Sequence, residues 1–289
     1  MTTEPSARLN PLVGLLDLEQ IEQDIFRGQS RKTGWLRAFG GQVAAQALVA
    51  AGRTVASDRR VHSLHSYFIR PGDSTRPIVY TVDRIRDGRS FTTRRVVGVQ
   101  QGKAIFTLSA SFHIEESGLE HQARVPRDVP APEDVPTLAA RLRSADSASA
   151  HYLEDRSDEI ELRWVDDPPW ELPRKGPRTG GQRVWMRAAG QLPDDPLLHI
   201  CLLTYASDMT LLDSVLLRHG VMVGHEVTSM ASLDHAMWFM RPVRADDWFL
   251  YTTMSPFAAG GRGLATGRFF DQQGQQLASV VQEGLLRIG

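Results

Sequence analysis

Apolar positions in the first half of the chain follow two different periods. Between Phe39 and Val55 they recur every three or four residues, which predicts a helix with a buried face. Many of these residues are alanines, so a sheet can wrap closely around the helix. The following residues alternate between apolar and polar, which predicts strands at 61–70, 77–86, 90–100 and 104–114. A shorter helix is predicted earlier, from Leu12 to Arg27.

The second half shows a similar order of elements. A long helix is predicted from Pro196 to His219. Strands are predicted near 158–165 and 182–189, and then at 229–241, 247–256, 262–271 and 276–288. A long helix followed by antiparallel strands, without strand–helix–strand alternation, is typical of the α+β class.

A repeated motif links the two halves. Tyr67-Phe68-Ile69-Arg70-Pro71 returns as Trp238-Phe239-Met240-Arg241-Pro242, 171 positions later. Two long units of this kind indicate a duplicated fold that forms a pseudo-dimer, and not a solenoid of many repeats. The seam between such units is a favourable place for a ligand site.

A change in composition separates the two units. From Glu115 to about Ser157 the chain is rich in proline, acidic residues, serine and alanine. We predict an N-terminal unit at 1–118, a linker at 119–157 with a short helix at 137–144, and a C-terminal unit at 158–289.

The bulk composition excludes several classes of protein. The formal net charge is −1, which gives no electrostatic case for nucleic acid or an anionic membrane. No apolar stretch reaches the ~20 residues of a membrane span, so no membrane insertion is expected. Cys201 is the single cysteine, which excludes a disulfide framework and a zinc cluster and favours a buried structural thiol. With no secretory signal at the N-terminus, we expect a cytoplasmic protein.

Three polar residues stand out against apolar surroundings. Asp208 lies inside the helix predicted from Pro196 to His219, where burial would raise the basicity of its carboxylate; a solvent-facing aspartate is the alternative. Gln282 shares an otherwise apolar strand face, so it needs buried polar partners, either in a site or in a nearby loop. Ser232 precedes Leu233-Asp234-His235 and carries little information alone.

Metal and nucleotide chemistry find little support in the sequence. His62 and His65 would point to opposite faces of a strand, and we expect structural histidines and no metal site. The chain has no Gly-x-Ser-x-Gly elbow, and Gly261-Arg262-Gly263 lacks the context of a dinucleotide fingerprint.

Longer motifs resemble a known family, the TesB-type acyl-CoA thioesterase II family. The resemblance runs from about residue 12 to the end. The matching motifs are Phe39-Gly40-Gly41-Gln42, His62 to Asp73, Arg86 to Phe91, Tyr205-Ala206-Ser207-Asp208, Leu233 to Phe239, and Val281-Gln282-Glu283-Gly284.

The resemblance implies a double hotdog, in which two sheets join edge to edge and each wraps a long helix. It also implies hydrolysis of fatty acyl-CoA to free acid and CoA, without a metal or organic cofactor. The family's catalytic trio falls on Asp208, Ser232 and Gln282. A bacterial member has threonine in place of Ser232; serine keeps the hydroxyl, so this departure concerns rate more than chemistry.

These roles fit the chemistry of thioester hydrolysis. Asp208 would take a proton from water, while Ser232 and Gln282 orient that water. The leaving thiol has a pKa of roughly 8.5 and departs as a thiolate, so no histidine acid is needed. Backbone amides at the start of the helix predicted from Phe39 to Val55, those of Gly41 and Gln42, are candidates to stabilise the oxyanion.

Two other functions stay open. One is a non-catalytic acyl-CoA-binding module, and the other is a different hotdog enzyme such as an enoyl-CoA hydratase. The segment Asp208 to Asp213 lacks the Asn, Pro and His of the hydratase motif. The resemblance also implies a homo-oligomer, a dimer or a tetramer.

Overall fold

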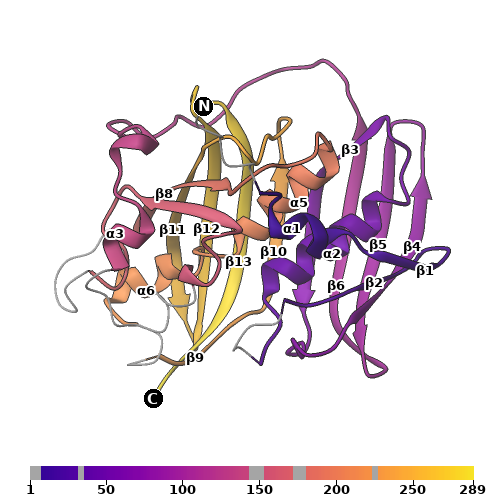
Figure 1. Ribbon diagram of the computed structural model, residues 1–289, viewed down its shortest axis with the longest axis horizontal. Coiled ribbons are helices and arrows are strands. Elements are labelled where there is room, and N and C mark those ends of the chain that lie inside the picture. The colour runs from indigo at the N-terminus through magenta and orange to yellow at the C-terminus, as the bar shows by residue number, and fades with distance from the viewer. Residues whose placement is uncertain (1–7, 32–35, 143–152, 172–179, 223–226) are drawn as a thin grey trace, which may run out of the picture.

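The protein is built around one continuous antiparallel sheet. The computed structural model describes residues 8–31, 36–142, 153–171, 180–222 and 227–289. Its strands form a 13-stranded sheet in the order β1-β2-β4-β5-β6-β3-β10-β13-β12-β11-β8-β7, with β9 paired to β13. In Figure 1 the two ends of the colour scale fall on opposite halves of this sheet.

The N-terminal half supplies the first six strands. Its elements are α1 (Pro11–Leu16), β1 (Glu19–Glu22), β2 (Ile25–Gly28), α2 (Gly40–Gly52), β3 (Arg59–Phe68), β4 (Ile78–Asp87), β5 (Phe91–Gln100) and β6 (Lys103–Ile114). The predicted helix at 39–55 and the four predicted strands are confirmed.

The C-terminal half supplies the other seven strands. Between the halves lie η1 (Pro132–Asp134) and α3 (Leu138–Leu142). The later elements are β7 (Ile160–Trp164), β8 (Gly181–Ala188), α5 (Pro196–Ser207), α6 (Asp213–His219), β9 (Val227–Ser232), β10 (Asp234–Phe239), β11 (Phe249–Ala259), β12 (Arg262–Asp271) and β13 (Gln276–Ile288).

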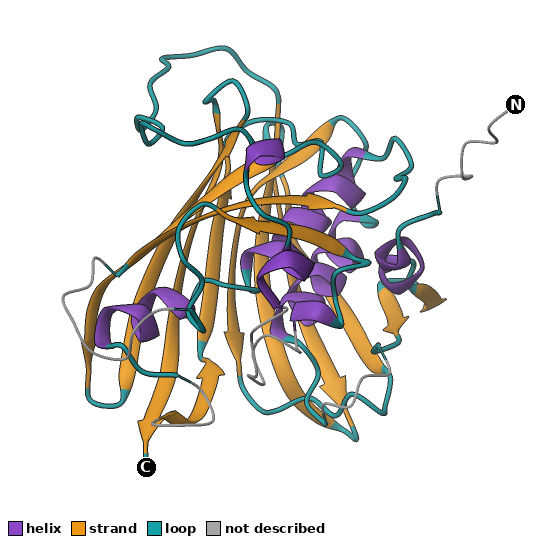
Figure 2. Cartoon of the chain, turned by 60° about the vertical axis from the view of Figure 1, so that its left-hand side comes forward, coloured by secondary structure: helices purple, strands orange, loops and turns teal. Residues whose placement is uncertain are grey.

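The helices gather on one side of the sheet (Figure 2). α2 packs against β4, β5 and β6, and its alanines are fully buried. α5 packs against α2. Gly52 at the end of α2 lies beside Leu197 at the start of α5, and Gly41 at the start of α2 lies beside Tyr205 near the end of α5. The two central helices are therefore antiparallel.

The two halves join through β3 and β10. These strands pair antiparallel, with Tyr67 opposite Asp234 and Ser63 opposite Trp238. The repeated aromatic motif found in the sequence therefore lies on the two seam strands. Together with a central helix from each half, this is the α+β double hotdog that the resemblance implies, and the prediction is confirmed.

Two predicted helices are wrong in extent. The helix expected from Leu12 to Arg27 is only the six-residue α1, followed by the β1–β2 hairpin, which turns at Asp24 with a positive φ of 59°. The helix expected from Pro196 to His219 is two helices, because α5 ends at Ser207 and α6 begins at Asp213. The strand expected at 229–241 is likewise divided into β9 and β10 at Leu233.

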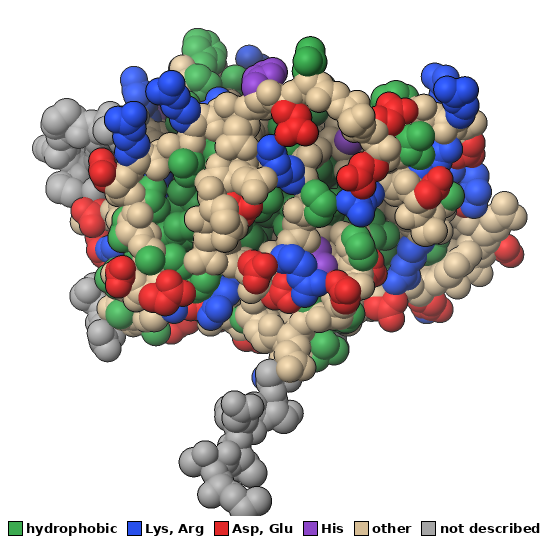
Figure 3. All heavy atoms as spheres, turned by 90° about the horizontal axis from the view of Figure 1, so that it is seen from above, with side chains coloured by type: hydrophobic (Ala, Val, Ile, Leu, Met, Phe, Trp, Pro, Cys, Tyr) green, Lys and Arg blue, Asp and Glu red, His purple; other side chains and the backbone are tan. Residues whose placement is uncertain are grey.

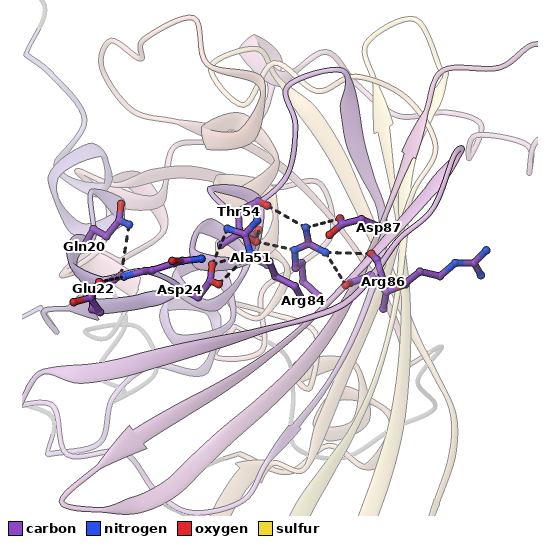
Figure 4. A network of polar contacts seen from close by, with 11 residues as sticks. Gln20, Glu22, Asp24, Ala51, Thr54, Arg84, Arg86 and Asp87 are labelled. Carbon is purple, nitrogen blue, oxygen red and sulfur yellow. Dashed lines mark hydrogen bonds and ion pairs between the residues drawn. The ribbon is translucent and has the colours of Figure 1, made fainter.

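The C-terminal end of α2 is held by a buried arginine. The guanidinium of Arg94 donates to the Thr54 side chain and carbonyl, just beyond α2, and to the carboxylate of Asp87 at 2.6 Å. A cation at this end of a helix also complements its dipole. Figure 4 shows Thr54 and Asp87 close together, with the ion pair of Asp24 and Arg84 beside them. This network anchors the end of α2 that lies farthest from Gly40.

Candidate active site

Asp208 lies where the two central helices meet. We expected Asp208 inside a helix, but it is the residue that caps the C-terminus of α5. Because α5 and α2 are antiparallel, its carboxylate faces the N-terminus of α2. The backbone amide of Gly41 hydrogen-bonds to this carboxylate. A carboxylate at the positive end of a helix dipole is in a favourable position.

Two glycines make this approach possible. A Cβ atom on Gly40 would lie 2.6 Å from Oδ2 of Asp208, and a Cβ atom on Gly41 would lie 2.5 Å from the carbonyl oxygen of Tyr205. Both distances are too short for non-bonded atoms. The Gly40-Gly41 pair therefore lets the start of α2 contact the end of α5.

The three residues singled out in the sequence come together in space. Gln282 on β13 donates from Nε2 to Oδ1 of Asp208 at 2.9 Å and to Oγ of Ser232 at 2.6 Å. Ser232, the last residue of β9, lies 3.3 Å from the same Oδ1 atom. Three elements thus deliver one side chain each to a single hydrogen-bonded cluster.

The break between β9 and β10 positions Ser232. The amide of Leu233 donates to the carbonyl of Glu283, and the carbonyl of Leu233 accepts from the amide of Phe68. Leu233 thus bridges β13 and β3. The chain turns at this residue, and Ser232 is held where β13 places Gln282.

His235 is a fourth member of the cluster, and no role for it was predicted from the sequence. Its Nδ1 atom lies 2.6 Å from Oε1 of Gln282, and its Nε2 atom lies 2.8 Å from Oγ of Ser207. Because an amide oxygen can only accept, Nδ1 carries the proton and donates it. His235 therefore fixes the amide of Gln282 with its NH₂ group toward Asp208. The available signal was the alternation of β10, which places His235 on the same buried face as Met237 and Phe239.

Burial sets the protonation of the cluster. It raises the pKa of Asp208, and the nearby His235 together with the hydrogen bonds from Gln282, Gly41 and Ser232 offset this only in part. Burial also lowers the pKa of His235, which keeps the imidazole neutral. The site thus combines a carboxylate of increased basicity with an uncharged histidine.

A cavity of about 990 Å³ opens onto the cluster. Asp208 and Ser232 line it, whereas the fully buried Gln282 lies behind them. We divide the other lining residues by the half of the chain that supplies them, and call the two groups the N-side arm and the C-side arm. The N-side arm includes Arg37, Phe39, Val43, Phe68, Arg70 and Phe106, and the C-side arm includes Met209, Leu212, Asp213, Met230, Leu285 and Arg287.

The two proposed oxyanion donors occupy different surroundings. The amide of Gly41 already contacts Asp208. The side chain of Gln42 bonds to Gln29, Ser30 and Arg31, and so holds the segment before α2 against the helix.

Metal-ligand and nucleophile candidates lie elsewhere. Among the described residues, no group of three or more His, Cys, Asp or Glu side chains could hold a metal ion. His62 bonds to Ser111, and His65 packs edge-on against Trp238. Burial raises the pKa of the Cys201 thiol, which makes it a poor nucleophile.

No helix in the described part of the chain is long and apolar enough to cross a membrane.

Comparison with family models gives a match in each half. A model described as acyl-CoA thioesterase matches residues 153–285. A model described as acyl-CoA thioesterase N-terminal domain matches residues 29–113.

Named relatives match over nearly the whole chain. Acyl-coenzyme A thioesterase 8 of Homo sapiens is 40% identical and covers 95% of this chain and 88% of that protein. Acyl-CoA thioesterase 2 of Haemophilus influenzae is 38% identical, with coverages of 96% and 98%. The crystal structure of an acyl-CoA thioesterase II, TesB2, from Mycobacterium marinum has a TM-score of 0.77 and 44% identity, with coverages of 95% and 97%.

Proposed function

The chain belongs to the acyl-CoA thioesterase family, and we propose that it hydrolyses fatty acyl-CoA to free fatty acid and CoA at the Asp208–Ser232–Gln282 cluster. One observation carries the assignment to these residues: the three side chains form a single hydrogen-bonded cluster on the wall of a large, mostly apolar cavity. Burial of a carboxylate with specific polar partners in a cavity is typical of a catalytic site.

The proposed reaction uses water directly. Asp208 accepts a proton from a water molecule as the water oxygen bonds to the thioester carbon. The carbonyl oxygen takes up the electron pair and becomes an oxyanion. When the carbonyl re-forms, the C–S bond breaks and CoA leaves as a thiolate; the proton held by Asp208 passes to this thiolate, which restores the carboxylate. Burial raises the pKa of Asp208, so its carboxylate is a stronger base than one in water.

Orientation is the proposed role of the other two side chains. Ser232 lines the cavity beside Asp208 and can hold the same water molecule. Gln282 lies behind both and donates to both, so it fixes the distance between them. Holding a nucleophile in a reactive geometry can account for several orders of magnitude in rate.

We place the oxyanion at the N-terminus of α2, near Gly41 and Gln42. Gly40 lines the cavity there, and the helix dipole favours negative charge. Because the amide of Gly41 also contacts Asp208, the oxyanion would share this donor or displace the carboxylate from it.

Assembly and location are proposed on separate grounds. Large apolar side chains are exposed on the seam strands and next to them, including Tyr67, Ile69 and Met240. An exposed apolar face of this kind supports a homo-oligomer, a dimer or tetramer, which sedimentation would measure. The free, buried Cys201 suits a reducing cytoplasm. Over the face drawn in Figure 3, acidic and basic side chains are interspersed, in line with a net charge of −1.

The test is release of free thiol from purified protein and an acyl-CoA. We expect turnover by the wild type and a loss of at least about a hundredfold in Asp208→Asn, because the amide keeps the size but removes the base. Asp58→Asn, at an exposed aspartate, is the matched control. Near-normal activity of Asp208→Asn would rule out the mechanism. Binding without thiol release would indicate an acyl-CoA-binding module, and loss of an enoyl chromophore without thiol release a hydratase.

A further inference from the structure

The C-side arm of the cavity contains a second carboxyl group, that of Asp213. This residue is the first of α6 and follows Asp208 by one turn of irregular chain. Its side chain lines the cavity and forms no hydrogen bond or ion pair with any residue that the structure describes. The neighbouring walls are apolar and include Met209, Leu212 and Leu285. Asp213 is half-buried, so water in the cavity can reach its carboxyl group, and an acyl group that displaces this water must supply a polar partner in its place.

Charge distinguishes the two arms. Arg37 and Arg70 lie on the N-side arm, both are exposed, and neither forms an ion pair with the described residues. They can meet the phosphates of CoA. The C-side arm has Arg287 but also has Asp213, whose carboxylate would repel phosphates. CoA therefore fits the N-side arm, and the acyl group extends past Asp208 into the C-side arm.

The chemistry of Asp213 defines what the acyl group should carry. Burial alone raises the pKa of Asp213 to about 7, so near neutral pH the group is a mixture of acid and carboxylate. The acid both donates and accepts, and the carboxylate accepts. A hydroxyl group can pair with either form, whereas a methylene group leaves both without a partner.

We propose that Asp213 forms a polar subsite in the acyl arm, and that this subsite selects acyl groups that carry a hydroxyl over plain hydrocarbon chains of the same length. The proposal rests on the proposed function, because it assumes that Asp208 marks the thioester carbon. Asp213 acts as a specificity-determining residue and takes no part in bond cleavage.

The test compares acyl-CoA pairs of equal chain length, with and without a hydroxyl at carbon 3, at mid-chain or at the terminal carbon. We expect the wild type to prefer the hydroxylated member of at least one pair by about tenfold or more in kcat/KM. Asp213→Leu should reverse this preference by removing the polar group and adding apolar wall. Asp213→Asn keeps a hydrogen-bond donor and an acceptor, so it should retain most of the preference for the hydroxylated acyl group.

Controls separate this proposal from the proposed function. Asp58→Leu, at an exposed aspartate, should leave the preference unchanged. Equilibrium binding of the matching free acids to the wild type and to Asp213→Leu reports the same preference without catalysis. If thiol is never released yet hydroxy acids bind more tightly through Asp213, the proposed function fails and the subsite stands. Equal kcat/KM values for both members of every pair, unchanged in Asp213→Leu, would overturn the subsite alone.

Discussion

At the scale of single residues, the chemistry of the site depends on which way the Gln282 amide faces. His235 decides this, because its Nδ1–H donates to Oε1 of Gln282. The Nε2 atom of Gln282 then donates to Asp208 and Ser232. The histidine never touches the cavity, so it acts as a positioning residue. Replacement of His235 should therefore disturb the positions of the Asp208 carboxylate and the Ser232 hydroxyl together.

We therefore expect His235→Leu to lower kcat by about tenfold to a hundredfold while KM changes little, since orientation is lost but the cavity wall is not. His235→Asn places an amide N–H close to the position of Nδ1 and should recover most of the rate. Steady-state kinetics and a pH profile of both variants measure this. Equal loss in both variants, with normal folding, would show that only the volume of His235 matters.

Ser232 allows a second test at the same scale. Ser232→Thr keeps the hydroxyl and should change the rate modestly, whereas Ser232→Ala removes it and should cost about 10–100-fold in kcat. The hydroxyl lies between Gln282 and Asp208, so its removal leaves an amide N–H without an acceptor. Thiol release by the two variants measures the difference. An alanine variant as active as the wild type would remove Ser232 from the mechanism.

The sequence predicted Asp208 and Gln282 because each is polar among apolar neighbours. It did not predict the role of His235, because its partners Gln282 and Ser207 lie on β13 and α5, far away in the sequence. Nor did the sequence predict Asp213 as a cavity residue. Alternation reports which face a side chain occupies, but not which side chains meet across two elements.

At the scale of elements, the break between α5 and α6 is the feature that apolar spacing could not predict. Apolar residues continue through Met209, Leu211 and Leu212, so the pattern favours one helix. The helix ends because the carboxylate of Asp208 is hydrogen-bonded to Gln282 and Ser232 on the sheet, and because the hydroxyl of Ser214 donates to the carbonyl of Leu211. The strands β3, β5 and β6 were predictable, since buried positions alternate over most of their length.

The same break creates a pH-dependent cost in α6. Burial raises the pKa of Asp213 to about 7, so the folded state binds this proton more tightly than the unfolded chain does. The contribution of protonated Asp213 to the free energy of unfolding is full below the pKa of the unfolded chain, about 3.9, and is lost as pH rises towards 7.

We expect the wild type to lose about 2–3 kcal/mol relative to Asp213→Asn between pH 5 and pH 8, because the amide does not titrate. Denaturant unfolding of both proteins at the two pH values measures this. A difference that stays constant with pH would contradict the raised pKa. Titratable and charged groups on the strands packed against α6, or in the shared cavity, are the same in both proteins: Arg183 and Arg187 on β8, Tyr251 on β11, Arg262, Arg268 and Asp271 on β12, and Asp208, Arg37, Arg70, Arg156 and Arg287 around the cavity.

At the scale of the whole molecule, the three proposed catalytic side chains all come from one of the two duplicated halves. Gln282 corresponds to Ala110 in the first half, at the offset of 172 residues between Gln100-Gln101-Gly102 and Gln272-Gln273-Gly274. Asp208, Ser232 and Gln282 all belong to the second half, whereas the amide of Gly41 that faces Asp208 belongs to the first. The first half therefore contributes a helix terminus and a cavity wall.

We expect the two halves to be inactive when produced apart, as residues 1–118 and 119–289. The second piece holds all three side chains but lacks the N-terminus of α2 and the strand β3 that pairs with β10. Thiol release should fall to background for each piece and return when both are expressed together. Wild-type turnover by residues 119–289 alone would show that the N-terminal half is not needed for catalysis.

The β3–β10 seam also has a consequence for how the site responds to dilution. In an assembly of separate subunits, a site built across the contact disappears as protein concentration falls below the dissociation constant. Here the chain between β6 and β7 connects the two halves covalently, so the effective concentration of one half around the other does not change when the protein is diluted. The activity per molecule should therefore not depend on protein concentration, even at dilutions where dimers or tetramers have dissociated.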